Sequence, residues 1–177
     1  MIGRISRVIK LIKADMNLNN KLTYLSEQGA KIGKGTRLNC KVSSFGTEPY
    51  LVEVGEDCLF AANISFITHD GGIKVLNTLK YFDGKSMDKL GKIKIGNNVY
   101  IGQGALIMPG VTIGDNCIIG ANAVVTRDIP SKSVAVGMPA RVIKTIDEYY
   151  ENCKDKLHPT AKMNTSEKRK YCEENFI

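Results

Sequence analysis

The sequence contains no tryptophan, and aromatic residues make up only 7% of its 177 positions. This scarcity favours a core of small aliphatic residues over one built around large rings. Glycine is abundant, with 17 residues, and 43% of the chain is apolar, which is enough material to bury a core. Together these numbers favour one domain assembled from small aliphatic units.

Paired cysteines are also lacking. The five cysteines are an odd number, widely spaced, and no CxxC occurs. This pattern argues against a disulfide scaffold and against a structural zinc site. Free thiols are typical of a reducing cytosol, so we expect a cytoplasmic protein that requires no metal.

No long hydrophobic run is present, and residues 1–16 are too charged for a signal peptide or a membrane span. They instead place Ile2, Ile5, Ile9 and Ile12 on one helical face, with the basic residues largely off it. Such a helix can contact a membrane surface or cap the end of a domain. We favour the second interpretation and predict an N-terminal helical cap over residues 1–30.

Positive charge is concentrated at the start of the chain. The net charge is +7, and residues 1–50 hold nine Lys or Arg against three Asp or Glu. A basic surface attracts phosphorylated ligands, nucleic acid or anionic lipid. Because no nucleic-acid-binding motif accompanies it, a phosphate-rich cofactor or substrate fits best.

A six-residue repeat organises the middle of the chain. Six consecutive hexads run in phase from Ile95: IGNNVY, IGQGAL, IMPGVT, IGDNCI, IGANAV and VTRDIP. The first position of each hexad is aliphatic and the fifth is small or aliphatic. Fixed periods of this kind are typical of solenoids, in which three hexads make one coil and stacked coils share an apolar column.

Weaker hexads start upstream, and the phase slips around residues 44–53 and 72–94. A phase slip in a solenoid indicates an inserted loop, and a long loop in a compact domain is commonly functional. We therefore predict a repeat domain over residues 31–144 with an inserted loop near residues 72–92. A C-terminal helix and polar tail are expected over residues 145–177.

The hexads and the closing segment VTRDIPSKSVAVGMPARVIK at residues 125–144 resemble the hexapeptide-repeat acyltransferases. The resemblance covers roughly residues 30–150 and is greatest to O-acetyltransferases of sugars and surface polysaccharides. It implies an all-β solenoid, specifically a left-handed parallel β-helix with short helices at both ends. It also implies a homotrimer that binds acetyl-CoA, the acyl donor, in a groove between neighbouring subunits.

The resemblance implies six cofactor-binding residues. Gln103 and Ala121 would line the pantetheine arm, Thr126 and Arg127 would lie near the adenosine, and Arg141 and Lys144 would face the phosphates. The cations suit phosphate chemically. Gln103 departs from the small residue common in some relatives.

His69 is the predicted catalytic residue. Transfer of an acyl group from a thioester needs a base for the incoming hydroxyl, and neutral imidazole suits this task near neutral pH. His69 lies at the end of a predicted coil, in ITHDGG, where a cleft would form. A backbone carbonyl is expected to orient it, and Asp70 is expected to form a turn or contact the acceptor.

Other residues have plainer interpretations. His158, the second of two histidines, lies in a polar stretch, and two histidines are too few for the three-imidazole zinc site of related carbonic anhydrases. Cys58 and Cys117 occupy fifth positions and are expected in the core. Gly102 and Gly104 lack the context of a nucleotide fingerprint.

The sequence leaves three functions open. The first is acetyl transfer to a sugar or polysaccharide-precursor hydroxyl, with His69 as base. The second is N-acetylation of an amino sugar or an antibiotic. The third is a non-catalytic trimeric β-helix, which the retained histidine and cationic closing segment disfavour.

Overall fold

The computed structural model describes the backbone of residues 2–176 and the side chains of residues 8–176. Internal contacts divide the chain into two units, one ending at Ile146 and the other starting at Asp147. The first unit contains every strand of the described chain and all of the predicted site residues.

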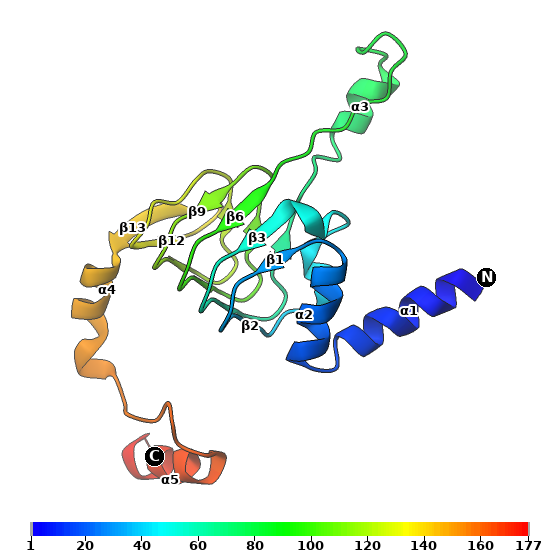
Figure 1. Ribbon diagram of the computed structural model, residues 1–177. Coiled ribbons are helices and arrows are strands. Elements are labelled where there is room, and N and C mark those ends of the chain that lie inside the picture. Colours follow the sequence, from blue (N-terminus) through cyan, green and yellow to red (C-terminus); the bar gives the residue numbers. More distant parts are fainter. Residues whose placement is uncertain (1, 177) are drawn as a thin grey trace. The chain divides into compact units, whose positions relative to one another are not determined.

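Three parallel sheets, which we name A, B and C, form the body of the first unit (Figure 1). Sheet A consists of β1 (Lys31–Ile32), β3 (Val52–Val54), β6 (Ile93–Ile95) and β9 (Thr112–Ile113). Sheet B consists of β2 (Arg37–Leu38), β4 (Leu59–Phe60), β7 (Tyr100–Ile101), β10 (Ile118–Ile119), β12 (Ser133–Val136) and the antiparallel edge strand β13 (Arg141–Thr145). Sheet C consists of β5 (Ser65–Phe66), β8 (Leu106–Ile107) and β11 (Val124–Val125).

The chain visits sheets A, B and C in turn, so each circuit forms one coil, and like strands of successive coils pair in parallel. In the first coil the 3-10 helix η1 (Val42–Phe45) follows the sheet B strand, where later coils have a sheet C strand. A second 3-10 helix, η2 (Pro49–Leu51), leads back to sheet A. The stacked coils predicted from the hexads are therefore present.

The core is the column of residues that the hexad pattern predicted. All six first positions from Ile95 to Val125 are at most 4% exposed, and all six fifth positions from Val99 to Ile129 are at most 5% exposed. Cys58 and Cys117 are each 1% exposed, which confirms their core assignment. Burial raises the pKa of both thiols, so they stay protonated and behave as small apolar groups.

Two helices precede the first coil: α1 (Ile2–Ala14) and α2 (Leu18–Glu27). Helix α2 packs on the coil through Leu25, which is fully buried. The Lys21 ammonium donates to the carbonyl oxygens of Leu38, at 3.1 Å, and Cys40, at 2.7 Å. These carbonyls lie at the open end of the stack, where no further coil supplies a donor. The prediction that Ile2 and Ile5 share the apolar face concerns side chains outside the described residues.

The predicted insertion leaves and re-enters the stack at one point. It contains α3 (Ile73–Thr78), and Figure 1 shows it as an arm beyond the coils. At its base, His69 pairs with Leu90 in an antiparallel bridge. The amide of Asp70 donates to the carbonyl of Lys89, and the amide of Gly91 donates to that of Thr68, both at 2.9 Å. Both ends of the arm are thus fixed beside His69.

The second unit is helical. Helix α4 (Ile146–Cys153) begins at the boundary and is followed by η3 (Lys154–Lys156) and α5 (Thr165–Phe176). His158 lies between them, with Nδ1 3.0 Å from the Tyr171 hydroxyl and its ring edge-on to Phe176. These contacts agree with a structural role for His158.

Candidate functional site

His69 lies three residues after β5, at the corner where the chain turns from sheet C toward sheet A. Its side chain is 48% exposed, although the preceding Thr68 is buried. The isolated bridge and the backbone hydrogen bonds at the base of the insertion hold the backbone on both sides of this corner. The imidazole is therefore accessible to a ligand but held on a rigid frame, as acid–base chemistry requires.

Glu48 orients His69, which corrects the expectation of a backbone carbonyl. The Oε2 atom of Glu48 lies 3.0 Å from His69 Nδ1 and also accepts a short hydrogen bond from the Thr68 hydroxyl. The Oε1 atom accepts from the Thr47 hydroxyl at 2.7 Å. Both oxygens of this carboxylate are thus engaged, and its side chain is only 18% exposed.

These contacts determine the charge of Glu48. Hydrogen bonds from the hydroxyls of Thr68 and then Thr47 lower the pKa of Glu48 from 4.5 to about 2, with His69 adding a smaller effect. The carboxylate is therefore ionised throughout the physiological pH range and can only accept hydrogen bonds. In the neutral imidazole the proton must then reside on Nδ1, which leaves the lone pair of Nε2 available as a base.

No motif in the sequence points directly to Glu48, which precedes His69 by 21 positions. It lies within the first phase slip, at residues 44–53, one coil before His69. One feature of the sequence could have pointed to Glu48. It is an acidic residue inside an inserted loop, one coil before a histidine at a corner. Because stacked coils bring equivalent corners together, that offset could have indicated the pair.

A hollow of 390 Å³ adjoins His69. Its wall combines apolar and hydroxyl-bearing groups from α1, α2, the η1 segment and the end of β5: Leu11, Tyr24, Val42, Ser43, Gly46, Thr47, Pro49, Phe66, Ile67, Thr68 and His69. The hydroxyls of Thr47 and Thr68 already donate to Glu48, and the remaining hydroxyls, together with the apolar wall, are suited to a polyol ligand with apolar ring faces. This hollow can therefore hold a small polar substrate next to the base.

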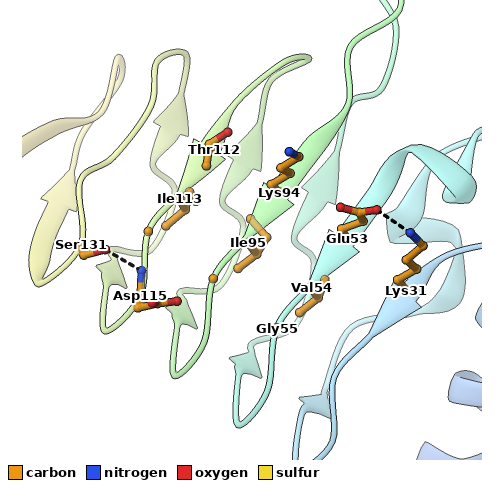
Figure 2. A pocket seen from close by; sticks show the side chains of 12 residues that line it. Lys31, Glu53, Val54, Gly55, Lys94, Ile95, Thr112, Ile113, Asp115 and Ser131 are labelled. Carbon is orange, nitrogen blue, oxygen red and sulfur yellow. Dashed lines mark hydrogen bonds and ion pairs between the residues drawn. The ribbon is translucent and has the colours of Figure 1, made fainter.

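A larger hollow, of 540 Å³, lies over sheet A and contains none of the predicted site residues (Figure 2). Its carboxylate Glu53 already has two cationic partners: Lys92, which lies outside the lining, at 2.7 Å and Lys31 at 2.9 Å. These two ammonium groups hold the pKa of Glu53 at about 2. The Ser131 hydroxyl accepts from the amide of Asp115 at 3.0 Å. Because this face contains no histidine and its carboxylate Glu53 is held in ion pairs, we place the site at His69.

The six residues predicted to bind the cofactor occupy three places in the first unit. Gln103 and Ala121 lie at one corner, between sheets B and C, and the amide of Asn122 donates to the carbonyl of Gln103 there. Thr126 and Arg127 follow β11 at the same corner type as His69, two coils further along. These four residues are exposed.

Arg141 and Lys144 lie on β13, at the edge of sheet B. Arg141 is exposed, and its Nη1 donates to the carbonyl of Ala140 at 2.8 Å. The fold of one subunit therefore distributes the six residues over both ends of the sheet C strands and one edge of sheet B, and does not gather them around His69.

The neighbours of His69 have structural partners. The Oδ1 atom of Asp70 accepts from the amide of Gly72 at 2.9 Å, as a turn-forming aspartate does, and Oδ2 pairs with Lys89 at 3.1 Å. Among the described residues no cluster of three or more His, Cys, Asp or Glu side chains is placed to hold a metal ion.

Comparison with known proteins identifies the repeats. Residues 92–127 match the family model "Bacterial transferase hexapeptide (six repeats)". The chain is 37% identical to Protein CapG of Staphylococcus aureus over 169 residues, which cover 95% of this chain and 94% of the relative. It is 38% identical to the galactoside O-acetyltransferase of Escherichia coli (strain K12) over 120 residues, 68% of this chain and 57% of that protein.

The fold agrees with this relationship. A solved structure of a galactoside acetyltransferase in complex with coenzyme A superposes with a TM-score of 0.55 over 88% of this chain and 84% of the other, at 24% identity. The repeat match, the relative aligned along nearly its whole length, and the coiled arrangement of parallel strands agree with one another. The chain belongs to the hexapeptide-repeat acyltransferase family.

Proposed function

We propose that this protein is an acetyl-CoA-dependent O-acetyltransferase that acts on a sugar or polysaccharide-precursor hydroxyl, on a left-handed β-helix. The pairing of His69 with ionised Glu48 beside a hydroxyl-lined hollow carries the proposal. Two relationships support it: the E. coli relative is a galactoside O-acetyltransferase, and the superposed galactoside acetyltransferase holds coenzyme A.

The reaction needs no covalent enzyme intermediate, because the thioester already carries an activated acetyl group. The acceptor hydroxyl attacks the thioester carbonyl, and its proton passes to Nε2 of His69. Glu48 then faces an imidazolium and stabilises its charge. The tetrahedral intermediate collapses, the carbon–sulfur bond breaks, and the imidazolium returns its proton to the departing sulfur. The products are an acetyl ester and coenzyme A.

His69→Ala tests the base. We expect kcat to fall by about 10²–10⁴-fold, the usual contribution of a general base, with the fold and acetyl-CoA binding retained. The wild-type rate should rise with pH as the imidazole loses its proton, and the variant should lose this rise. His158→Ala is the control and should behave like wild type. A near-normal kcat for His69→Ala at saturating substrates would contradict the assignment.

Glu48→Gln tests the orienting carboxylate. Because the pKa of Glu48 is about 2, removing its charge changes the site at every pH at which the assay is run. We expect kcat to fall by at least about tenfold, with KM for acetyl-CoA unchanged. Glu53→Gln is a matched control, since Glu53 has an equally low pKa but lies on sheet A. Equal losses in the two variants would show that the effect is structural.

Arg141→Ala tests the phosphate contact. A charge-assisted hydrogen bond contributes about 1.5–3 kcal/mol, so KM for acetyl-CoA should rise by about 10- to 100-fold with kcat nearly kept. Arg169→Ala, which removes an exposed cation from α5, is the control. An unchanged KM in Arg141→Ala would exclude this residue from the cofactor site.

We propose that the site is completed in a homotrimer. The outward side chains of sheets B and C are largely apolar, including Leu59, Tyr100, Ile118, Leu106 and Val124, whereas those of sheet A are mostly charged. Packing of these apolar faces between copies would form a groove in which the Gln103 corner of one subunit meets His69 of the next. The cofactor-binding residues, which lie at three separate places within a single chain, would then come together across the interface between two chains.

The oligomeric state is measured by light scattering at micromolar concentration. We expect three times the monomer mass. A monomer with full activity would contradict the shared groove.

Assays with sugars and with amino sugars as acceptors distinguish O-acetylation from N-acetylation. If no acceptor causes release of coenzyme A, a non-catalytic scaffold would be favoured.

A further inference from the structure

Helix α1 presents an apolar face that the rest of its unit leaves uncovered. Val8 is 54% exposed, Ile9 48% and Ile12 63%, and Met16, just after the helix, is 73% exposed. Large aliphatic side chains seldom gather on the surface of a soluble protein without a partner. Folding of the coils does not account for them.

The opposite side of α1 makes the contacts with the body. Ala14 is buried and Leu11 packs against the core. The Lys10 ammonium pairs with Glu27 at 3.1 Å and lies over the Tyr24 ring, 5.6 Å from its centre. At about 100° per residue, Val8, Ile9 and Ile12 span an arc of roughly 100°, and Leu11 and Ala14 lie outside it. The apolar face therefore points away from the attachment.

The charge of the helix indicates what this face binds. Its sequence contains Arg4, Arg7, Lys10 and Lys13 and no acidic residue. Asp15, which follows, already accepts from the amide of Val42 at 2.8 Å. Pairing two copies through this face would bring together two helices whose sequences carry only basic charge, which electrostatic repulsion opposes. An anionic surface instead complements both the cations and the apolar side chains.

We propose that α1 binds an anionic lipid bilayer, lying in the plane of the membrane surface with Val8, Ile9 and Ile12 inserted below the headgroups. The helix has 13 residues, so it is about 20 Å long, too short to cross a hydrocarbon core of about 30 Å. No described helix is long and apolar enough for a membrane span. This role changes our sequence-based interpretation of residues 1–16, in which a cap was preferred to a membrane contact.

The test is co-sedimentation of the full chain with sucrose-loaded vesicles. One set contains phosphatidylcholine alone, and the other also contains about 30% phosphatidylserine. We expect at least about tenfold stronger binding to the anionic vesicles, and we expect this binding to fall in about 0.5 M NaCl, where charges are screened. Equal binding to both vesicle types, or no binding to either, would overturn the proposal.

The triple variant Val8→Ser, Ile9→Ser, Ile12→Ser removes the apolar face at exposed positions, so the body should remain folded. We expect it to lose at least about tenfold in vesicle affinity, and Lys13→Glu to weaken binding as well. Val75→Ser with Leu79→Ser is the matched control, because it changes one exposed apolar residue on α3 and another that directly follows the helix, and it should bind like wild type. Acetyl transfer between soluble substrates should be unchanged in the triple variant, so this test is independent of the proposed chemistry.

A triple variant that changes oligomeric state but keeps vesicle binding would show that the face joins copies of the chain.

Discussion

The stacking of one coil directly on the next is the constraint on which the rest of the structure depends. At one corner of the stack, a Cβ atom added to Gly33 would lie 2.4 Å from the backbone of Gly55. Cβ atoms added to Gly55 and Gly96 would likewise meet the backbone of Gly96 and Gly114 within 2.8 Å. Equivalent positions therefore lie against one another with no room for a side chain, and glycine is required along the column. This close approach constrains how the sheet A strands that precede these glycines stack on one another.

The same stacking creates the site. Glu48 and His69 meet because the corner after η1 in the first coil is adjacent to the corner after β5 in the second. The Thr68 hydroxyl, buried between them, donates to the carboxylate and not to a carbonyl of its own coil. A buried hydroxyl costs free energy unless it is hydrogen-bonded, so the core itself favours keeping Glu48 ionised and in place. Orientation of the base is thus coupled to packing of the coils.

Local periodicity explains which features the sequence could predict. The twelve buried hexad positions could be predicted because the same six-residue pattern recurs in each coil. Both insertions could be predicted because they interrupt that pattern. The Glu48–His69 contact depends instead on how many residues each insertion absorbs, which periodicity does not specify. The six predicted cofactor-binding residues raise a related difficulty: resemblance can supply their identity, but one chain places them at three separate positions. In the trimer that we propose, their convergence would depend on subunit packing, which no pattern within the chain encodes directly.

The two N-terminal helices show that amphipathicity alone does not identify a partner. Both have an apolar side, yet α2 is the helix that buries Leu25 and uses Lys21 to satisfy the carbonyls at the open end of the stack. Those carbonyls need a donor, because burying them unpaired would destabilise the first coil. Once α2 meets this need, the fold requires only Leu11 and Ala14 of α1. The exposed aliphatic residues of α1 then have no function in folding, and its sequence carries more basic residues than the Lys10–Glu27 pair uses. Surface positions free of such demands are where a binding function can be encoded without loss of stability, and an anionic membrane is the surface that matches both properties of this helix.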